Sequence, residues 1–303
     1  MSEIFKHQEM TAMPPGMVAC DSCAKPDIYL IVADEYAGNQ ELKELFGYDN
    51  SPFFNELKKR GFQVKENPRS NYNFTPFSVA SILNFDYLPL KDPGHSAPET
   101  GMVTEMIKNS RLQQFLQASG YQVYNCSTFD LAGLPTESAE AFLPAKTKFI
   151  TAQTFLSRLE RDIFFNLITR FKIRWIIKKS MYHSRENNKV LYSRTMEAVG
   201  QNKHPKFVYT HLTLPHFPYF FDENGKPNDY DSLFEVYNRK QYLSYLKYGN
   251  KKYLSLIDFI LKNNPDPPLI ILMSDHGYRD YRIPGGAKYL FMNICAIYDP
   301  YAG

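Results

Sequence analysis

Residues 26–36 read PDIYLIVADEY, a six-residue apolar run bounded by a proline-aspartate pair and by an acidic pair. A short apolar run without polar alternation is typical of a strand that is buried on both faces, as the central strands of parallel sheets are. Residues 28–33 are therefore predicted to form a central strand. Asp34 and Glu35 are predicted to follow this strand at its carboxyl end.

The segments beyond this strand alternate between helical and strand patterns. Asn50 and Ser51 favour a helix start, and this helix is predicted to continue to Lys59. Further helices are predicted at 111–119 and 238–263, and further strands at 61–64, 120–124, 207–212, 268–273 and 289–297. Such alternation predicts an α/β fold in which a mostly parallel central sheet carries helices on both faces.

Length and composition fit one large globular domain. The chain has 303 residues, 44% of them hydrophobic and 22% charged, which excludes a disordered or fibrous protein. The formal net charge of +3 gives no indication of a nucleic-acid partner. No apolar run approaches the ~18 residues that a membrane span needs. We expect a linker or arm at residues 1–25 and one domain at residues 26–303.

One segment departs from the alternation. Residues 156–185 carry eight Arg or Lys residues interleaved with aromatic and aliphatic side chains, Trp175 among them. Two interpretations stay open. The favoured one is a helical insertion around residues 150–200 that packs on the sheet with its charges in solvent. The other is a stretch that lies in an anionic membrane interface.

Acidic and imidazole side chains follow three of the predicted strands. These side chains are Asp34 and Glu35, His211 and His216, and Asp275 and His276. Ligands of parallel α/β sheets bind at the carboxyl ends of the strands, so these groups are expected to converge. Carboxylates and neutral imidazoles are the donors that Zn²⁺ and Mn²⁺ take in proteins. The sequence therefore predicts a divalent metal site at this edge of the sheet.

A fourth contribution is predicted from the segment Asn73-Phe74-Thr75-Pro76. Proline fits the first turn of a helix, which places Thr75 at the N-cap. Its hydroxyl would lie beside unpaired backbone N–H groups and the positive end of the helix dipole, where a phosphoryl group would also bind. An ordinary threonine cap is the alternative interpretation.

In chain order, these motifs resemble the sulfatase-like branch of the alkaline phosphatase superfamily. The resemblance rests on PDIYLIVADEY at 26–36, the helix start at Thr75, HLTLPHFPY at 211–219 and SDHG at 274–277. Within this branch the chain is most similar to the lipoteichoic acid synthase and phosphoethanolamine transferase group, whose members use a threonine nucleophile. The resemblance implies a metal-dependent phosphotransferase or phosphohydrolase that acts on phosphodiesters or lipid head groups.

The resemblance also implies roles for individual residues. It implies one divalent ion, Zn²⁺ or Mn²⁺ rather than Ca²⁺ or Mg²⁺, with ligands drawn from Asp34, Glu35, Thr75, Asp275 and His276. Thr75 would be the nucleophile. His216 matches the substrate-binding histidine of the family, with His211 near it, and Asn73 or Asn71 would help to stabilise charge on the phosphoryl oxygens.

Two departures from the family pattern define the alternatives. Sulfatases need a Cys or Ser in a C/S-x-P-x-R signature, whereas residues 75–79 read TPFSV, so a sulfatase is the less favoured activity. No histidine follows His276, so Arg279, Arg282 or Lys288 would replace the later histidine of the relatives. The competing hypothesis is a catalytically silent domain that binds lipid or glycan at a membrane.

The same resemblance predicts the setting of the domain. Domains of this group follow transmembrane helices and continue past the last predicted strand. We therefore expect a catalytic domain that is truncated at its C-terminus, belongs to an inner-membrane protein and lies outside the cytoplasm, in the periplasm or on the outer face of the membrane. Its expected partners are a phosphodiester or lipid-linked substrate and a membrane surface.

Overall fold

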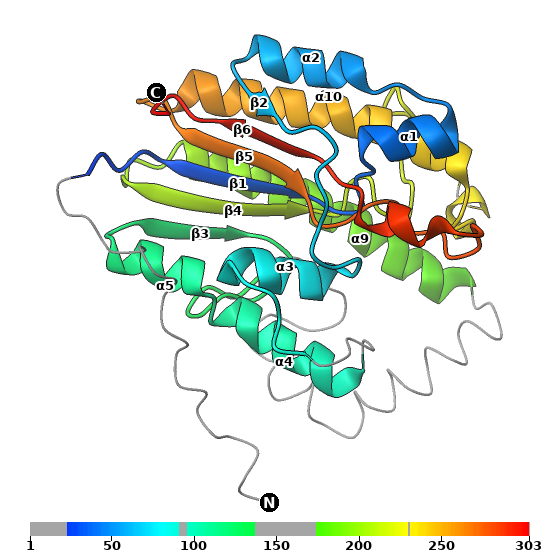
Figure 1. Ribbon diagram of the computed structural model, residues 1–303, viewed down its shortest axis with the longest axis horizontal. Helices are drawn as coiled ribbons and strands as arrows, with labels where there is room; N and C mark the ends of the chain where they lie inside the picture. The colour runs from blue at the N-terminus through cyan, green and yellow to red at the C-terminus, as the bar shows by residue number, and fades with distance from the viewer. Residues whose placement is uncertain (1–22, 91–95, 137–173, 230, 303) are drawn as a thin grey trace, which may run out of the picture.

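A six-stranded sheet forms the centre of the molecule, shown in Figure 1 as a computed structural model that describes residues 23–90, 96–136, 174–229 and 231–302. The strand order is β2-β6-β5-β1-β4-β3. The strands are β1 (Ile28–Ala33), β2 (Gln63–Val64), β3 (Gln122–Cys126), β4 (Lys206–Leu212), β5 (Leu269–Ser274) and β6 (Cys295–Tyr298). β5, β1, β4 and β3 pair in parallel, whereas β6 and β2 add two antiparallel strands at one side. The predicted α/β fold with a mostly parallel sheet is confirmed.

The apolar run of β1 is explained by its central position. β1 pairs with β4 on one side and with β5 on the other. Successive side chains of a strand point to opposite faces, so Tyr29 and Ile31 pack into one core and Leu30 and Val32 into the other. All four side chains are buried. A polar residue on either face would therefore lie in a core.

Helices cover both faces of the sheet (Figure 1). One core lies between the sheet and the helices α1 (Asn39–Phe46), α2 (Ser51–Lys59), α9 (Arg174–Val199) and α10 (Arg239–Asn263). The other core lies against α3 (Thr75–Asn84), α4 (Ala97–Lys108) and α5 (Arg111–Ala118). Two short 3₁₀-helices, η3 (Asp231–Phe234) and η4 (Gly286–Phe291), complete the described elements.

The strand predicted at 289–297 is wrong in its first half. Residues 286–291 form η4, and the strand β6 begins only at Cys295. The backbone carbonyls of Leu290 and Met292 accept hydrogen bonds from Gly277 and Gly38, which lie in loops beyond the ends of β5 and β1. These carbonyls therefore hold loops in place rather than forming a strand ladder.

The segment predicted as an insertion around 150–200 lies partly outside the described residues, which do not include 137–173. Residues 174–199 form α9, which packs against β4 and β3. Leu191, Ala198 and Val199 of this helix are buried in the core. α9 is followed in the chain by β4, so this part of the segment belongs to the α/β core. Residues 1–22 of the predicted arm also lie outside the description, and no helix in the described ranges has the length and apolar character to cross a membrane.

A buried ion pair occupies the amino ends of β1 and β4. Asp27 accepts a hydrogen bond from the backbone N–H of Lys206 (2.9 Å) and lies 2.8 Å from Nδ1 of His204. The Lys206 side chain is fully buried, and its ammonium donates to the carbonyls of Val199 (2.7 Å) and Gln201 (3.1 Å). A cation at the C-terminus of α9 also complements the helix dipole. This ion pair fixes the connection from α9 to β4.

Candidate active site

The carboxylate of Asp275 joins the carboxyl ends of β1 and β5. Its Oδ1 accepts the backbone N–H groups of Glu35 (3.0 Å) and His276 (2.9 Å). To present its N–H, Glu35 takes a φ of 59°, in the left-handed region that non-glycine residues rarely occupy. The N–H of Asp34 donates to the carbonyl of Leu212 at the end of β4 (3.0 Å). Three strand ends therefore meet at one place.

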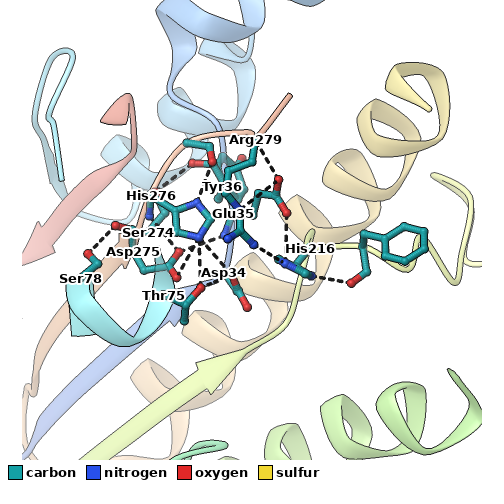
Figure 2. A network of polar contacts seen from close by, with 12 residues as sticks. Asp34, Glu35, Tyr36, Thr75, Ser78, His216, Ser274, Asp275, His276 and Arg279 are labelled. Atoms are coloured by element: carbon teal, nitrogen blue, oxygen red, sulfur yellow. Dashed lines mark hydrogen bonds and ion pairs between the residues drawn. The ribbon is translucent and has the colours of Figure 1, made fainter. Parts of the chain in front are cut away.

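Thr75 lies at the start of α3 and faces this edge (Figure 2). The helix begins one residue earlier than predicted, so Phe74 is the N-cap and Thr75 is the first helical residue. The Thr75 hydroxyl lies 3.3 Å from Oδ1 of Asp34 and 3.1 Å from Nε2 of His276. Nδ1 of His276 lies 2.8 Å from the carbonyl of Gly277 and donates to it, which leaves the Nε2 lone pair directed at the hydroxyl.

The motif SDHG has a steric reason for its glycine. A Cβ atom on Gly277 would lie 2.2 Å from the carbonyl oxygen of Tyr289 and 2.5 Å from that of Met292. No other residue fits without moving the backbone.

Ser78 of α3 donates to the carbonyl of Asp275 (2.6 Å), so α3 and the loop after β5 are held together.

A second group of charged side chains lies beside the first. Glu35 turns its carboxylate toward Arg279 and His216: Oε1 accepts the backbone N–H of Arg279 (2.8 Å), and Oε2 lies 3.4 Å from Nε2 of His216. The Arg279 guanidinium lies 2.8 Å from the same imidazole nitrogen. Of the three basic residues considered in place of a later histidine, Arg279 is the one at this site. Arg282 pairs with Asp280 (2.8 Å) and Lys288 with Glu44 (2.9 Å).

Burial and mutual charge shift the pKa values of these groups. Burial, with the added charge of Asp275, raises the pKa of Asp34 to about 7. For Asp275 itself, burial is outweighed by the neighbouring imidazoles of His276 and His211, and the pKa is lowered. Burial lowers the pKa of His276, and it lowers that of His211 to about 4. The His216 pKa is raised because Asp34 and Glu35 outweigh its burial.

The donor atoms present suit a divalent cation. One donor atom each from Asp34, His211 and Asp275 lie within 4.8 Å of one another, and all three residues are buried. His211 lies within β4, and its Nε2 has no hydrogen-bond partner among the described residues. A set of carboxylate oxygens and a neutral imidazole fits Zn²⁺ or Mn²⁺. In the described part of the chain, Asn73 makes no hydrogen bond to these side chains.

The fold and this edge define a class of protein, an α/β domain of alkaline-phosphatase-like type with carboxylates, imidazoles and a hydroxyl at the carboxyl ends of its strands. The Sulfatase family model matches residues 26–291, and the chain belongs to this family. The family resemblance of the sequence motifs is thereby confirmed. No curated protein matches this sequence.

Solved structures of low sequence identity share the fold. The C-terminal periplasmic domain of EcEptC from Escherichia coli is 14% identical with a TM-score of 0.55, and the match covers 95% of this chain and 76% of that chain. The same domain in complex with Zn is 13% identical, with a TM-score of 0.53 over 95% of this chain and 77% of that one.

An integral membrane protein is also similar in fold. It is the integral membrane protein lipooligosaccharide phosphoethanolamine transferase A (EptA) from Neisseria meningitidis, 12% identical with a TM-score of 0.54. The match covers 95% of this chain but 49% of that protein, so this chain spans about half of its length.

Residues without any sequence motif also support the site. The Tyr242 hydroxyl, from α10, donates to the carbonyl of Glu35 (2.7 Å) and accepts the N–H of Ala37 (2.9 Å). Ser274 donates its hydroxyl to the carbonyl of Tyr36 (2.9 Å). These bonds hold the left-handed turn after β1. Tyr242 is one of 22 tyrosines, and nothing in the sequence distinguishes it from the others.

Proposed function

We propose that this chain is a metal-dependent phosphoryl transferase or hydrolase with Thr75 as its nucleophile. The observation that carries the proposal is the position of the Thr75 hydroxyl, at the N-terminus of α3 and within 3.3 Å of Asp34 and 3.1 Å of His276. Membership of the sulfatase family and the folds of the phosphoethanolamine transferases support it. The absence of a cysteine or serine at position 75 argues against formylglycine chemistry.

The proposed cation is a single Zn²⁺ or Mn²⁺ ion. Asp34, Thr75, Asp275 and His276 would hold it, with the carboxylate of Glu35 beside them. The Zn-bound structure of the related EcEptC domain supports zinc. Such an ion acts as a Lewis acid, since it lowers the pKa of the hydroxyl and neutralises charge on the phosphoryl oxygens.

The proposed reaction has two steps. In the first, Thr75 Oγ1 bonds to phosphorus, and the bond from phosphorus to the leaving oxygen breaks. The hydroxyl proton passes to Asp34, and the leaving oxygen takes a proton from solvent. In the second, water or an acceptor hydroxyl attacks the phosphothreonine and releases its own proton to solvent, the bond from Oγ1 to phosphorus breaks, and Asp34 returns its proton to Oγ1.

Arg279 and His216 are proposed to bind the non-bridging phosphoryl oxygens, with help from Asn73. Arg279 is always cationic and offers a planar set of donors that matches phosphate. Its backbone N–H is held by Glu35, and its guanidinium lies over the Phe74 ring next to Thr75, 5.8 Å from the ring centroid. The cation is therefore oriented beside the nucleophile.

The proposed substrate is a phosphodiester or a lipid-linked head group outside the cytoplasm. The related structures, a periplasmic domain and a lipooligosaccharide phosphoethanolamine transferase, support this class. We propose a periplasmic or outer-face location, with an adjacent membrane surface.

The test is turnover of an activated phosphodiester by wild type, Thr75→Ala and the control Thr104→Ala, which changes an exposed threonine of α4. With Zn²⁺ or Mn²⁺ added, Thr75→Ala is expected to lose roughly 10³-fold or more in kcat, with an unchanged unfolding temperature. Unchanged turnover in Thr75→Ala would exclude Thr75 as nucleophile. A wild type that is inactive with both metals would favour the silent binding domain.

A further inference from the structure

His211 is placed unusually for a histidine. It lies inside β4, paired with Val32 of β1, and 1% of its surface is exposed. The Phe129 ring packs on the imidazole, with 5.7 Å between the ring centroids. Its Nδ1 lies 3.3 Å from the hydroxyl of Tyr209. Nε2 is the ring nitrogen that has no hydrogen-bond partner among the described residues.

A buried polar atom without a partner is destabilising, by about 1–3 kcal/mol. An apolar side chain at position 211 would avoid this cost, because the other side chains of β4 are buried as well. The burial of His211 also disfavours direct contact with a substrate. A ligand that is small enough to reach Nε2 inside the protein is a water molecule or a metal ion, and the buried carboxylates of Asp34 and Asp275 nearby favour the cation.

The neighbours of Nε2 supply the remaining donors. One nitrogen of His211 and one oxygen each from Asp34 and Asp275 lie within 4.8 Å of one another. Metal–donor distances for zinc are about 2.0–2.2 Å, so donors on one tetrahedral ion lie about 3.4 Å apart. Donor separations of up to 4.8 Å would thus have to shorten by up to about 1.4 Å when an ion binds, which small side-chain rotations can supply.

We propose that His211 is a metal ligand, and that its Nε2 forms a three-donor position for a divalent cation together with Asp34 and Asp275. The inference rests on the proposed function only for the presence of a divalent cation. His276 faces the same two carboxylates, with its Nε2 3.7 Å from Oδ1 of Asp34 and 3.4 Å from Oδ2 of Asp275. His211 therefore adds a second imidazole to the ligands expected from the family motifs.

Tyr209 is a positioning residue in this arrangement. When Nδ1–H of His211 donates to the Tyr209 hydroxyl, the tautomer is fixed and the Nε2 lone pair faces the carboxylates. Hydrogen bonds of this kind to the outer nitrogen of a ligating histidine typically change metal affinity by about 10–100-fold.

The test is titration of the metal-free full chain with Zn²⁺ against a competing chromophoric chelator, without substrate. His211→Gln is expected to weaken zinc binding by roughly 100-fold or more, and Tyr209→Phe by about 10-fold. The matched control is His204→Gln, the same substitution at the opposite edge of the sheet, with wild-type affinity expected. Zinc affinity of His211→Gln within 2-fold of wild type, in a folded variant, would overturn the proposal.

A second measurement covers the case in which His211→Gln does not fold. In zinc-soaked crystals of the wild type, the anomalous signal is expected about 2.1 Å from Nε2 of His211. An ion bound only by Thr75 and His276, with His211 out of bonding range, would contradict the inference. Because neither measurement uses turnover, failure of Thr75→Ala to lose activity would refute the proposed reaction and leave the ligand assignment standing.

Discussion

The central sheet buries charged side chains at two places: the amino edge, formed by the amino ends of β1 and β4, and the carboxyl edge, formed by the carboxyl ends of β1, β4 and β5. The surroundings of these side chains differ between the two edges. At the amino edge, Asp27 and Lys206 each have hydrogen-bond partners. At the carboxyl edge, Nε2 of His211 is unpaired within the described residues, and Glu35 is held in the left-handed region. Paired charges indicate a structural role. Unpaired groups and strained backbone indicate a site arranged for a ligand.

The largest effect on stability is expected from removing one partner of the ion pair between Asp27 and Lys206 at the amino edge. Asp27→Ala leaves the Lys206 ammonium buried without its counterion, and loss of one partner of a buried pair costs about 3–5 kcal/mol. The free energy of unfolding, measured by urea denaturation, should fall by this amount, while turnover per folded molecule stays at the wild-type value.

The double variant Asp27→Ala/Lys206→Met is the control for this prediction. Removal of both charges should recover much of the lost stability, because no isolated charge remains buried. A double variant that is less stable than Asp27→Ala would show that the two edges do not differ in the proposed way.

A second prediction sharpens the description of the carboxyl edge. Glu35→Gly relieves the left-handed backbone, by about 1 kcal/mol, but it leaves the N–H of Arg279 without its acceptor, which costs about 1–3 kcal/mol, so the free energy of unfolding should not rise. The same change removes the carboxylate that holds Arg279 and should lower kcat/KM by roughly 100-fold. A loss of activity much larger than the change in stability would mark position 35 as functional.

Asn67→Gly is the matched control. Asn67 is exposed and has a φ of 45°, so glycine relieves the same kind of backbone strain outside the site. A gain in stability of about 1 kcal/mol with unchanged turnover is expected, because this exposed side chain leaves no buried group unpaired. A loss of activity in Asn67→Gly would mean that the effect at position 35 is not local.

The smallest effect is expected at Glu41, a buried carboxyl group of α1 behind the same edge. Its Oε2 accepts the backbone N–H of Tyr278 (3.3 Å), and burial raises its pKa well above the ordinary value of 4.5. A raised folded-state pKa stabilises the protein at low pH, and this contribution is lost as the pH rises through the folded-state pKa.

Glu41→Gln should therefore unfold near the wild-type temperature at pH 4 and at a higher temperature at pH 8, a difference of about 1 kcal/mol. Thermal unfolding across this pH range measures it. A variant that loses as much stability as wild type between pH 4 and pH 8 would contradict the assignment of this pH dependence to Glu41.

The elements that the sequence predicts well are those with one dominant local signal. The apolar run of β1 and the Asn50-Ser51 start of α2 predict those two elements because burial on two faces and helix initiation are local properties. The run at 289–297 misleads, because its first half is apolar through packing as η4 rather than as a strand. The side-chain directions of Glu35 and Arg279 depend on a loop held by residues from other elements, so no local pattern predicts them.

The long sequence separation between site residues has a consequence for how the protein folds. The bond from Glu35 to Asp275 joins residues that are 240 positions apart. Contacts of such high sequence separation form late and slowly, because the intervening chain must first be ordered. During synthesis, almost the whole domain must emerge before β5 can pair with β1. Metal binding by this edge would then report completed folding more strictly than secondary structure does. An N-terminal fragment that ends before β5 also lacks Asp275 and therefore lacks a complete set of ligands.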